Sequence, residues 1–404
     1  MSRPFVMAFM SNGFERCARM KKKIILFGHG TVGSAVFDAL VRTPMLDSRA
    51  EIARIIVRSP ETRAHLPYRG LFSKADHDMF EGIDIMIEAM GHDEPAGSYI
   101  KEALLRGIPV ITANKETMNT NFKDFSDISR DKRTPVLFES SVMAGVPVIR
   151  TLSTRGSLSS VNRIEGIMNG ATNFVLTRII DGGLTTAEAM DEARAKGFLE
   201  ADPTDDIMGF DAMRKLMILA KMIAGPDIIE SSVLRHGIVF PDDETRATIN
   251  AHGLLLRQVA NMSTDQSGLF LSVMPELLDK VHPLADVRYE ENMVRISGRD
   301  IDGIMLRGAG AGGSPTADGI MSDLSLLLDG HPYAITKPLA KRVIADPNKM
   351  FMRFALLIDP VLFPKSYTSR MLGNLVLTKE MTYGELKPWL PHIRFLAKVG
   401  FDDA

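Results

Sequence analysis

The chain has 404 residues, a formal net charge of -2, 45% hydrophobic residues and a single cysteine, Cys17. The length predicts two or three domains, and the small net charge argues against nucleic acid or an anionic membrane as a partner. One cysteine forms no internal disulfide, which fits a reducing compartment, and no uninterrupted apolar run is long enough to span a bilayer. We therefore expect a cytoplasmic protein.

The first 20 residues contain a short apolar run, PFVMAFM, between Arg3 and Arg16. Such a run is compatible with a weak signal or transit peptide. Because Met20 directly precedes KKKIILFGHG, we favour a disordered or mis-started extension.

Residues 23–27 predict a buried strand, and a GxGxxG motif follows at once, ahead of a helical segment. In this strand–loop–helix context the motif binds dinucleotides, because its glycines let the backbone approach the pyrophosphate at the helix N-terminus. The predicted cofactor contacts are Gly28, Gly30, Thr31, Val32 and Gly33.

The second predicted strand, residues 51–57, ends in Arg58 and Ser59. An enzyme specific for NAD usually has an acidic residue here for the ribose 2′-hydroxyl. A guanidinium and a hydroxyl suit a 2′-phosphate, so we predict NADP, with NAD as a possible second cofactor. The alternative is that Arg58 is only a surface residue.

Further apolar strands are predicted at residues 84–90, 109–112 and 135–139, with a helical segment between the first two. This alternation indicates a parallel sheet. Lys115 follows the strand ending at Thr112, at the edge where such sheets bind ligands, so it is a candidate site residue. The alternative is a surface lysine at a helix start.

The pattern changes near residue 150. An edge or antiparallel strand is predicted at residues 158–168 and helices at Asn169 and at 185–196, which together indicate an α+β domain. The glycine-dense run from Gly308 to Thr316 precedes an apolar helix, so we favour a turn packed against a ligand over a linker. Beyond it we expect one strand at 350–360 and one helix broken near Pro391.

The stretch from Gly197 to Lys215 concentrates five carboxylates and ends in an apolar helix. Asp211 and Lys215 are four residues apart and therefore share one helix face. A lysine within an apolar helix needs a partner, which favours a site over a solvated acidic loop with a surface ion pair. No Cys/His metal pattern and no GxSxG motif occur in the sequence.

With these motifs the chain resembles homoserine dehydrogenase. The matching segments are GHGTVG at Gly28, TANK at Thr112, EGIMNGATNFVLTRI at Glu165, GFLEADPTDDIMGFDAMRKLMILA at Gly197 and RGAGAGGSPTADGIMSDL at Arg307. The resemblance implies reversible NAD(P)-dependent reduction of L-aspartate 4-semialdehyde to L-homoserine, in threonine, methionine and isoleucine biosynthesis. It also implies a homodimer.

The resemblance implies roles for individual residues. Lys215 would give a proton to the carbonyl oxygen as hydride arrives, and Lys115 would assist from the other side of the substrate, near the nicotinamide. Glu200 and Asp211 would hold the substrate ammonium and orient Lys215. Asp206 and Thr172 would be further substrate contacts, and Gly197 and Gly310 would lie near the cofactor. An anionic pocket for an ammonium group and a positioned lysine agree with this chemistry.

The family often binds a monovalent cation, and the matching positions for Na⁺ are Glu139, Val142, Ala144 and Val146. Here two family glycines are replaced by Met143 and Ala144. If those positions need positive φ or close approach to the cofactor, the change has a cost.

We therefore predict an α/β protein with a Rossmann-type parallel sheet domain, an α+β substrate and dimerisation domain, and a short divergent C-terminal segment. The predicted divisions are 1–20 (extension), 21–150 (NAD(P)-binding), 151–315 (substrate), 316–345 (helix returning to the first domain) and 346–404 (divergent, not a complete ACT domain, with no ordinary threonine site). Two rival functions stay open: a dehydrogenase for another amino acid or amino aldehyde, and a non-catalytic NADP-binding protein.

Overall fold

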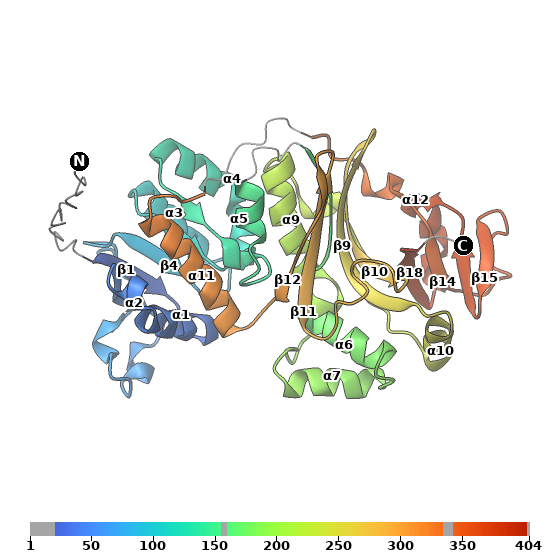
Figure 1. Ribbon diagram of the computed structural model, residues 1–404, viewed down its shortest axis with the longest axis horizontal. Coiled ribbons are helices and arrows are strands. Elements are labelled where there is room, and N and C mark those ends of the chain that lie inside the picture. The colour runs from blue at the N-terminus through green and yellow to red at the C-terminus, as the bar shows by residue number, and fades with distance from the viewer. Residues whose placement is uncertain (1–20, 155–159, 334–341, 402–404) are drawn as a thin grey trace, which may run out of the picture.

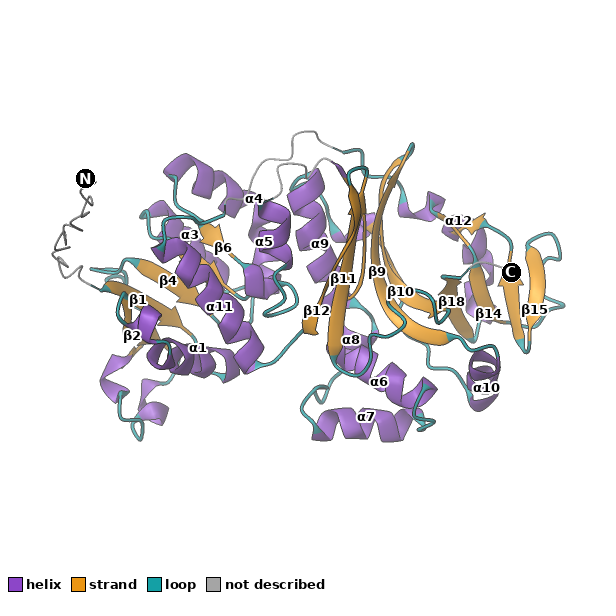
Figure 2. Ribbon diagram, in the orientation of Figure 1, coloured by secondary structure: helices purple, strands orange, loops and turns teal. Residues whose placement is uncertain are grey.

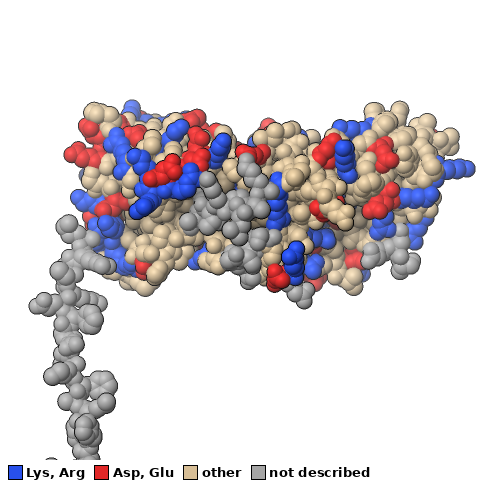
Figure 3. All heavy atoms as spheres, turned by 90° about the horizontal axis from the view of Figure 1, so that it is seen from above, with Lys and Arg blue, Asp and Glu red and all other residues tan. Residues whose placement is uncertain are grey.

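The computed structural model describes residues 21–154, 160–333 and 342–401. The predictions for the first 20 residues lie outside this range. Within the described residues, no helix combines the length and the apolar character that a membrane crossing requires. On the face seen in Figure 3, charged side chains of both signs are interspersed.

The N-terminal part is built on six parallel strands, at the left of Figure 1. Their order, β3-β2-β1-β4-β5-β6, is that of a dinucleotide-binding sheet. The strands are β1 (Lys22–Phe27), β2 (Ala50–Ile56), β3 (Phe72–Ser73), β4 (Ile85–Glu88), β5 (Val110–Thr112) and β6 (Val136–Leu137). The order reverses between β1 and β4, which places a ligand crevice at their carboxyl ends. The predicted α/β Rossmann-type fold is confirmed.

Helices connect and cover these strands (Figure 2). They are α1 (Thr31–Arg42), α2 (Pro44–Asp47), α3 (Ala96–Leu105), α4 (Lys115–Lys132) and α5 (Val148–Ser153). Helix α4 starts at Lys115 because the Asn114 side chain accepts hydrogen bonds from the backbone N–H groups of Glu116 and Thr117. This cap fixes Lys115 at the first helical position, just past the carboxyl end of β5.

The second part is organised around a mixed ten-stranded sheet. Its first strands are β7 (Val161–Ile167), β8 (Val233–Arg235), β9 (Leu255–Asp265), β10 (Gly268–Leu278), β11 (Glu291–Gly298) and β12 (Ile301–Ala309). The predicted strand at 158–168 is β7, which is antiparallel to both β9 and β11 and therefore interior, not an edge. The helices are α6 (Gly170–Ile180), α7 (Thr186–Ala195), α8 (Thr204–Ile207), α9 (Phe210–Ala224) and α10 (Asp243–Ala251).

Helix α11 (Gly313–Leu328) follows the glycine run and lies beside α1, in orange in Figure 1. A side chain at Gly313 would meet the Thr31 carbonyl oxygen at 2.8 Å. The helix is tied to the first sheet by the Ser140 hydroxyl, which donates to the Thr316 carbonyl (2.8 Å), and by the Glu139 N–H, which donates to Asp323 (3.0 Å). The glycine run is thus a packed turn between the two parts of the molecule.

The C-terminal segment continues the second sheet, at the right of Figure 1. Its strands follow the order β18-β14-β16-β15, and β18 pairs in parallel with β10 at Glu276 and Leu277. They are β14 (Phe354–Leu357), β15 (Thr368–Leu372), β16 (Leu375–Thr378) and β18 (Phe395–Val399); the short β13 (Phe351–Met352) and β17 (Met381–Thr382) pair separately. A helix, α12 (Tyr383–Leu386), precedes β18, whereas turns alone join β14 to β15.

Two C-terminal predictions were wrong. The strand expected at 350–360 is interrupted at Arg353, so that β13 and β14 belong to different sheets. The expected C-terminal helix ends at Leu386 and gives way to a 3-10 turn with Pro388 and Pro391, then to β18. Proline removes a backbone donor from the helix, and burial of the apolar residues after it favours the strand.

Candidate active site

Two cavities meet at the carboxyl ends of the first sheet. The larger, about 790 Å³, lies over β1, β2 and β4, and the smaller, about 470 Å³, lies between the two parts of the molecule. Gly30, Ala89 and Met90 line both, so the cavities form one continuous groove. A groove at the point where strand order reverses is the usual dinucleotide site.

The glycine loop fits a pyrophosphate. A side chain at Gly28 (φ +92°) would lie 2.5 Å from the Ala89 carbonyl oxygen, and one at Gly33 would lie 2.2 Å from the Gly28 carbonyl oxygen. Gly30 faces open space, with no atom within 4 Å of a built Cβ, and α1 begins at the next residue without a side-chain cap. The uncapped N–H groups of the first turn thus lie beside the groove, where they suit an anion.

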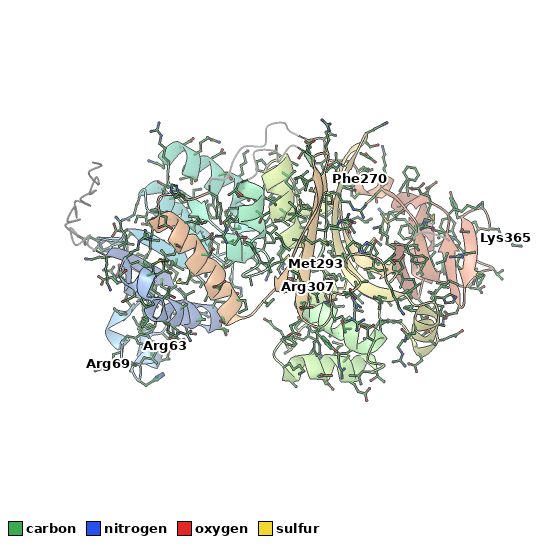
Figure 4. All side chains as sticks on the ribbon, in the orientation of Figure 1. Arg63, Arg69, Phe270, Met293, Arg307 and Lys365 are labelled. Atoms are coloured by element: carbon green, nitrogen blue, oxygen red, sulfur yellow. The ribbon has the colours of Figure 1, made fainter. Side chains whose placement is uncertain are left out.

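The larger cavity has a basic wall. Arg58, Ser59 and Thr62 follow the end of β2, and Arg63 and Lys74 lie on the same wall; Arg63 is labelled in Figure 4. His29 also lines this cavity, and burial, together with the nearby Arg63 charge, lowers its pKa. The sequence pattern predicted Arg58 but did not point to Arg63 or Lys74. Lys74 follows β3, so only the parallel pairing of β2 with β3 would have pointed to it.

The smaller cavity has a carboxylate between two lysines. Lys215 Nζ lies 2.8 Å from Asp211 Oδ2, and Lys115 Nζ lies 3.1 Å from Asp211 Oδ1. The first pair shares one helix face of α9, as the spacing predicted, whereas Lys115 comes from α4 of the other part. Asp211 is 6% exposed and Lys215 is 8% exposed. The charges of Asp211 and Lys215 are therefore held where water screens them weakly.

This arrangement favours the charged forms of Asp211 and Lys115. Burial alone would raise the pKa of Asp211, but Lys215 and Lys115 together lower it well below its ordinary value. Conversely, the Asp211 charge raises the pKa of Lys115 despite the burial of that lysine. Lys215 Nζ also donates to the Met168 carbonyl oxygen (2.8 Å), so two of its three N–H donors are fixed. Among the described residues no further acceptor is bonded to Lys215 Nζ, so its third N–H donor is open to a substrate oxygen.

The acidic loop adds two more carboxylates to the cavity wall, exposed Glu200 and half-buried Asp206. Burial raises the pKa of Asp206, while a hydrogen bond from Asn169 opposes that rise. Asn169 lines the cavity and contacts both Asp206 and Asp211. It caps α6, but its contact with the two carboxylates had no signal in the sequence.

The predicted site residues divide into two groups. Lining one or both cavities are Lys215, Lys115, Asp211, Glu200, Asp206, Arg58, Gly28, Gly30, Thr31, Val32, Gly310 and Ala144. Thr172, Gly33, Gly197, Glu139, Val142 and Val146 do not line either of them. The Thr172 hydroxyl donates to Asn169 Oδ1 (2.9 Å). Thr172 therefore lies behind Asn169, which lines the smaller cavity.

The positions matched to a cation lie beside the smaller cavity. Both Glu139 carboxylate oxygens accept hydrogen bonds at 2.8 Å, from the N–H groups of Ile149 and Arg150 at the start of α5. The Val146 carbonyl accepts from the Val148 N–H (2.8 Å). Carboxylate and backbone carbonyl oxygens are the ligands that hard cations prefer, so the chemistry of Glu139 and of the Val146 carbonyl is compatible with Na⁺. The described residues contain no group of three or more His, Cys, Asp or Glu arranged to hold a metal.

Both replaced glycines have left-handed backbone. Met143 has φ 60° and Ala144 has φ 53°. A residue with a Cβ costs roughly 1–2 kcal/mol in this region, so the chain retains the backbone shape that glycine would adopt without strain.

Replacing Ala144 with glycine tests this strain. The change relieves about 1–2 kcal/mol, but glycine gains about 0.4–1 kcal/mol of freedom in the unfolded chain and the buried methyl group of Ala144, about 0.8 kcal/mol, is lost. We therefore expect the free energy of unfolding to stay within about 0.5 kcal/mol of wild type, whereas the matched Met143→Gly should lower it by about 2 kcal/mol, because the whole buried Met143 side chain is lost. Urea unfolding of the two variants measures both changes, and an Ala144→Gly variant that loses more than about 1 kcal/mol would contradict the strain argument.

Comparison with known proteins gives consistent matches. A family model described as homoserine dehydrogenase, NAD binding domain, matches residues 28–139, and one described as homoserine dehydrogenase matches residues 147–325. The homoserine dehydrogenase of Bacillus subtilis (strain 168) is 32% identical over 325 residues, covering 78% of this chain and 74% of that protein.

Solved structures show the same fold. A homoserine dehydrogenase from Thiobacillus denitrificans gives a TM-score of 0.83 at 24% identity, covering 94% of this chain and 98% of that one. A hyperthermophilic archaeal homoserine dehydrogenase in complex with NADPH gives 0.66 at 27% identity, covering 78% and 99%.

Proposed function

The chain belongs to the homoserine dehydrogenase family, NAD(P)-dependent oxidoreductases that act on a CH–OH group, and from this premise we propose how its residues carry out the reaction. The substrates are L-aspartate 4-semialdehyde and L-homoserine. The observation that carries the proposal is the Asp211 carboxylate between Lys215 and Lys115, in a cavity continuous with the glycine loop.

When bound, the nicotinamide cofactor supplies the hydride that turns the aldehyde into an alcohol. The charge that develops on the carbonyl oxygen needs a cation and a proton. Lys215 supplies both from its unbound N–H and, in the reverse direction, takes the proton from the hydroxyl of homoserine. Lys115 is held by the same carboxylate and stabilises the oxygen from the cofactor side.

The substrate is also an α-amino acid, so its ammonium needs anionic partners. Glu200 and Asp206 line the cavity next to Asp211 and supply them. Asp211 itself orients Lys215, while Thr172 supports the wall through Asn169. This division of roles leaves the substrate between the acidic loop and the two lysines.

We propose NADP as the preferred cofactor, with NAD as a weaker substitute. The basic wall with Arg58, Arg63 and Lys74 supports this, since three cations suit a 2′-phosphate better than a hydroxyl. The solved archaeal relative holds NADPH.

The test is oxidation of NADPH and of NADH in the presence of aspartate 4-semialdehyde. We expect turnover with both and a lower KM for NADPH. Arg58→Glu should raise the KM for NADPH about tenfold or more and change the KM for NADH little, because a charged contact to the extra phosphate is lost. Arg69→Glu is the matched control, since Arg69, labelled near Arg63 in Figure 4, is exposed and does not line the cavity. Wild-type protein that binds cofactor but consumes neither form would refute the proposed function.

Two rivals have distinct signatures. A dehydrogenase for another amino acid or amino aldehyde would turn over a different member of a substrate panel faster. A non-catalytic NADP-binding protein would bind cofactor without turnover, and Lys215→Ala would change nothing. The acidic wall and the paired lysines favour homoserine dehydrogenase over both.

Further expectations remain proposals with their own support. They are a Na⁺ ion at Glu139 and the carbonyls of Val142, Ala144 and Val146, a homodimer, a cytoplasmic location, and the division into domains given above. The oxygen ligands that Glu139 and Val146 offer support the ion, and the single cysteine supports the compartment.

A further inference from the structure

Asn169 is hydrogen-bonded at every position its side-chain amide offers. Its Nδ2 donates to Asp206 Oδ1 (2.7 Å) and to Asp211 Oδ2 (2.8 Å). Its Oδ1 accepts from the Thr172 N–H (2.8 Å) and the Thr172 hydroxyl (2.9 Å). The residue is 5% exposed. An amide has two N–H donors and two acceptor lone pairs, so its capacity is filled.

We propose that Asn169 is a positioning residue for the reduction: it holds the Asp206 and Asp211 carboxylates side by side, and so fixes the orientation of Lys215. The inference rests on the function proposed above. Asn169 acts through the two acids and the lysine.

The negative charges of Asp206 and Asp211 make a shared hydrogen-bond donor necessary. Asp206 and Asp211 share one donor group, and each negative charge disfavours the other. Burial and the Asp211 charge raise the pKa of Asp206, and the Asn169 hydrogen bond is the largest influence opposing them. Without that bond Asp206 would gain a proton at a higher pH and would bind the substrate ammonium less well.

The residue type at position 169 is specific to this role. Asn169 is the N-cap of α6, a position that serine, threonine and aspartate also suit. Serine would keep the cap but lose both amide donors. Aspartate would keep the cap but place a third carboxylate against two others. Among these cap residues, only asparagine combines a cap acceptor with two donors for the acids.

Asn169 lies at the junction between β7 and α6. The preceding residue, Met168, accepts a hydrogen bond from Lys215 through its carbonyl oxygen (2.8 Å). Two consecutive residues between β7 and α6 therefore fix the lysine directly and through Asp211. A displacement of this junction moves the proton donor relative to the cofactor, and misalignment of about 1 Å can cost roughly 100-fold in rate.

The experiment compares Asn169→Ser and Asn169→Asp with wild type in kcat/KM for aspartate 4-semialdehyde across pH. We expect Asn169→Ser to fold normally, to lose about 100-fold in kcat/KM, and to shift the acidic limb of the pH profile upward. Asn169→Asp should lose more at neutral pH and recover in part at lower pH, where a protonated carboxyl again donates. Asp242→Ala, which removes the cap of remote α10, controls for cap loss and should leave kcat/KM within threefold.

A second readout does not depend on turnover. Carbon-13 carboxyl resonances of labelled aspartate should show an Asp206 pKa that is higher in Asn169→Ser than in wild type. Asn169→Ser with an unshifted pH profile, or with unchanged carboxyl titration, would overturn the inference. Wild-type protein without turnover would instead refute the proposed function, and the carboxyl titration would still decide the role of Asn169.

Discussion

Lys215→Met is expected to lower kcat for aspartate 4-semialdehyde reduction by about 10³-fold or more. The variant loses both the proton and the positive charge at the developing oxygen, and a positioned acid alone contributes about 10²–10⁴-fold. Methionine has nearly the same length and fits the apolar surroundings of α9, so the fold should persist. Cofactor binding, followed by calorimetry, should stay within severalfold of wild type.

The matched control is Lys221→Met in the same helix. Lys221 is also buried, with its Nζ 2.8 Å from Asn119 Oδ1, and burial lowers its pKa to about 8. It does not line either cavity. We expect Lys221→Met to alter stability but to keep kcat within about fivefold, since no reacting group is removed. Equal losses in the two variants would mean that α9 needs buried lysines for its structure and would remove Lys215 from the chemistry.

Asp211→Asn is expected to cost about 3 kcal/mol of unfolding free energy, because it leaves the buried ammonium group of Lys215 and the half-buried one of Lys115 without their carboxylate. It should also lower kcat at least about tenfold, since Lys215 loses the partner that orients it. Thermal or urea unfolding at pH 7 measures the first effect, and the NADPH assay measures the second.

The pH dependence of this loss follows from the lowered pKa of Asp211. A carboxyl group whose folded pKa lies below its unfolded value of 3.8 contributes stability that is complete above that value and is lost as the pH falls further. The stability difference between wild type and Asp211→Asn should therefore be constant from pH 6 to 8 and should shrink below about pH 4.

Asp205→Asn is the control for the acid. Asp205 lies in α8, just before α9, is exposed, and pairs with Arg214. A pair with an exposed carboxylate contributes about 0–1 kcal/mol, so this variant should stay close to wild type in both measurements. If Asp211→Asn were as mild as Asp205→Asn, the carboxylate would not be the group that holds the two lysines.

The sequence by itself determined those features that depend on residues close together in the chain. The glycine spacing at Gly28 to Gly33 predicted a cofactor loop, because a tight turn needs residues without side chains. The four-residue spacing of Asp211 and Lys215 predicted their contact, because helix geometry brings such positions together. The charge at the end of the second strand predicted Arg58 as a contact for a cofactor 2′-phosphate, and Arg58 lines the larger cavity.

Only the tertiary structure decided which distant segments meet. It brought Lys115 from α4 to Asp211 on α9, Lys74 from β3 to the wall with Arg58, and β18 to the edge of β10. No local spacing specifies these pairs, since each depends on how sheets and helices bury their apolar faces against one another. Asn169 illustrates the difference: its role as a helix cap follows from local preference, whereas its contact with two carboxylates some 40 residues away follows from packing alone.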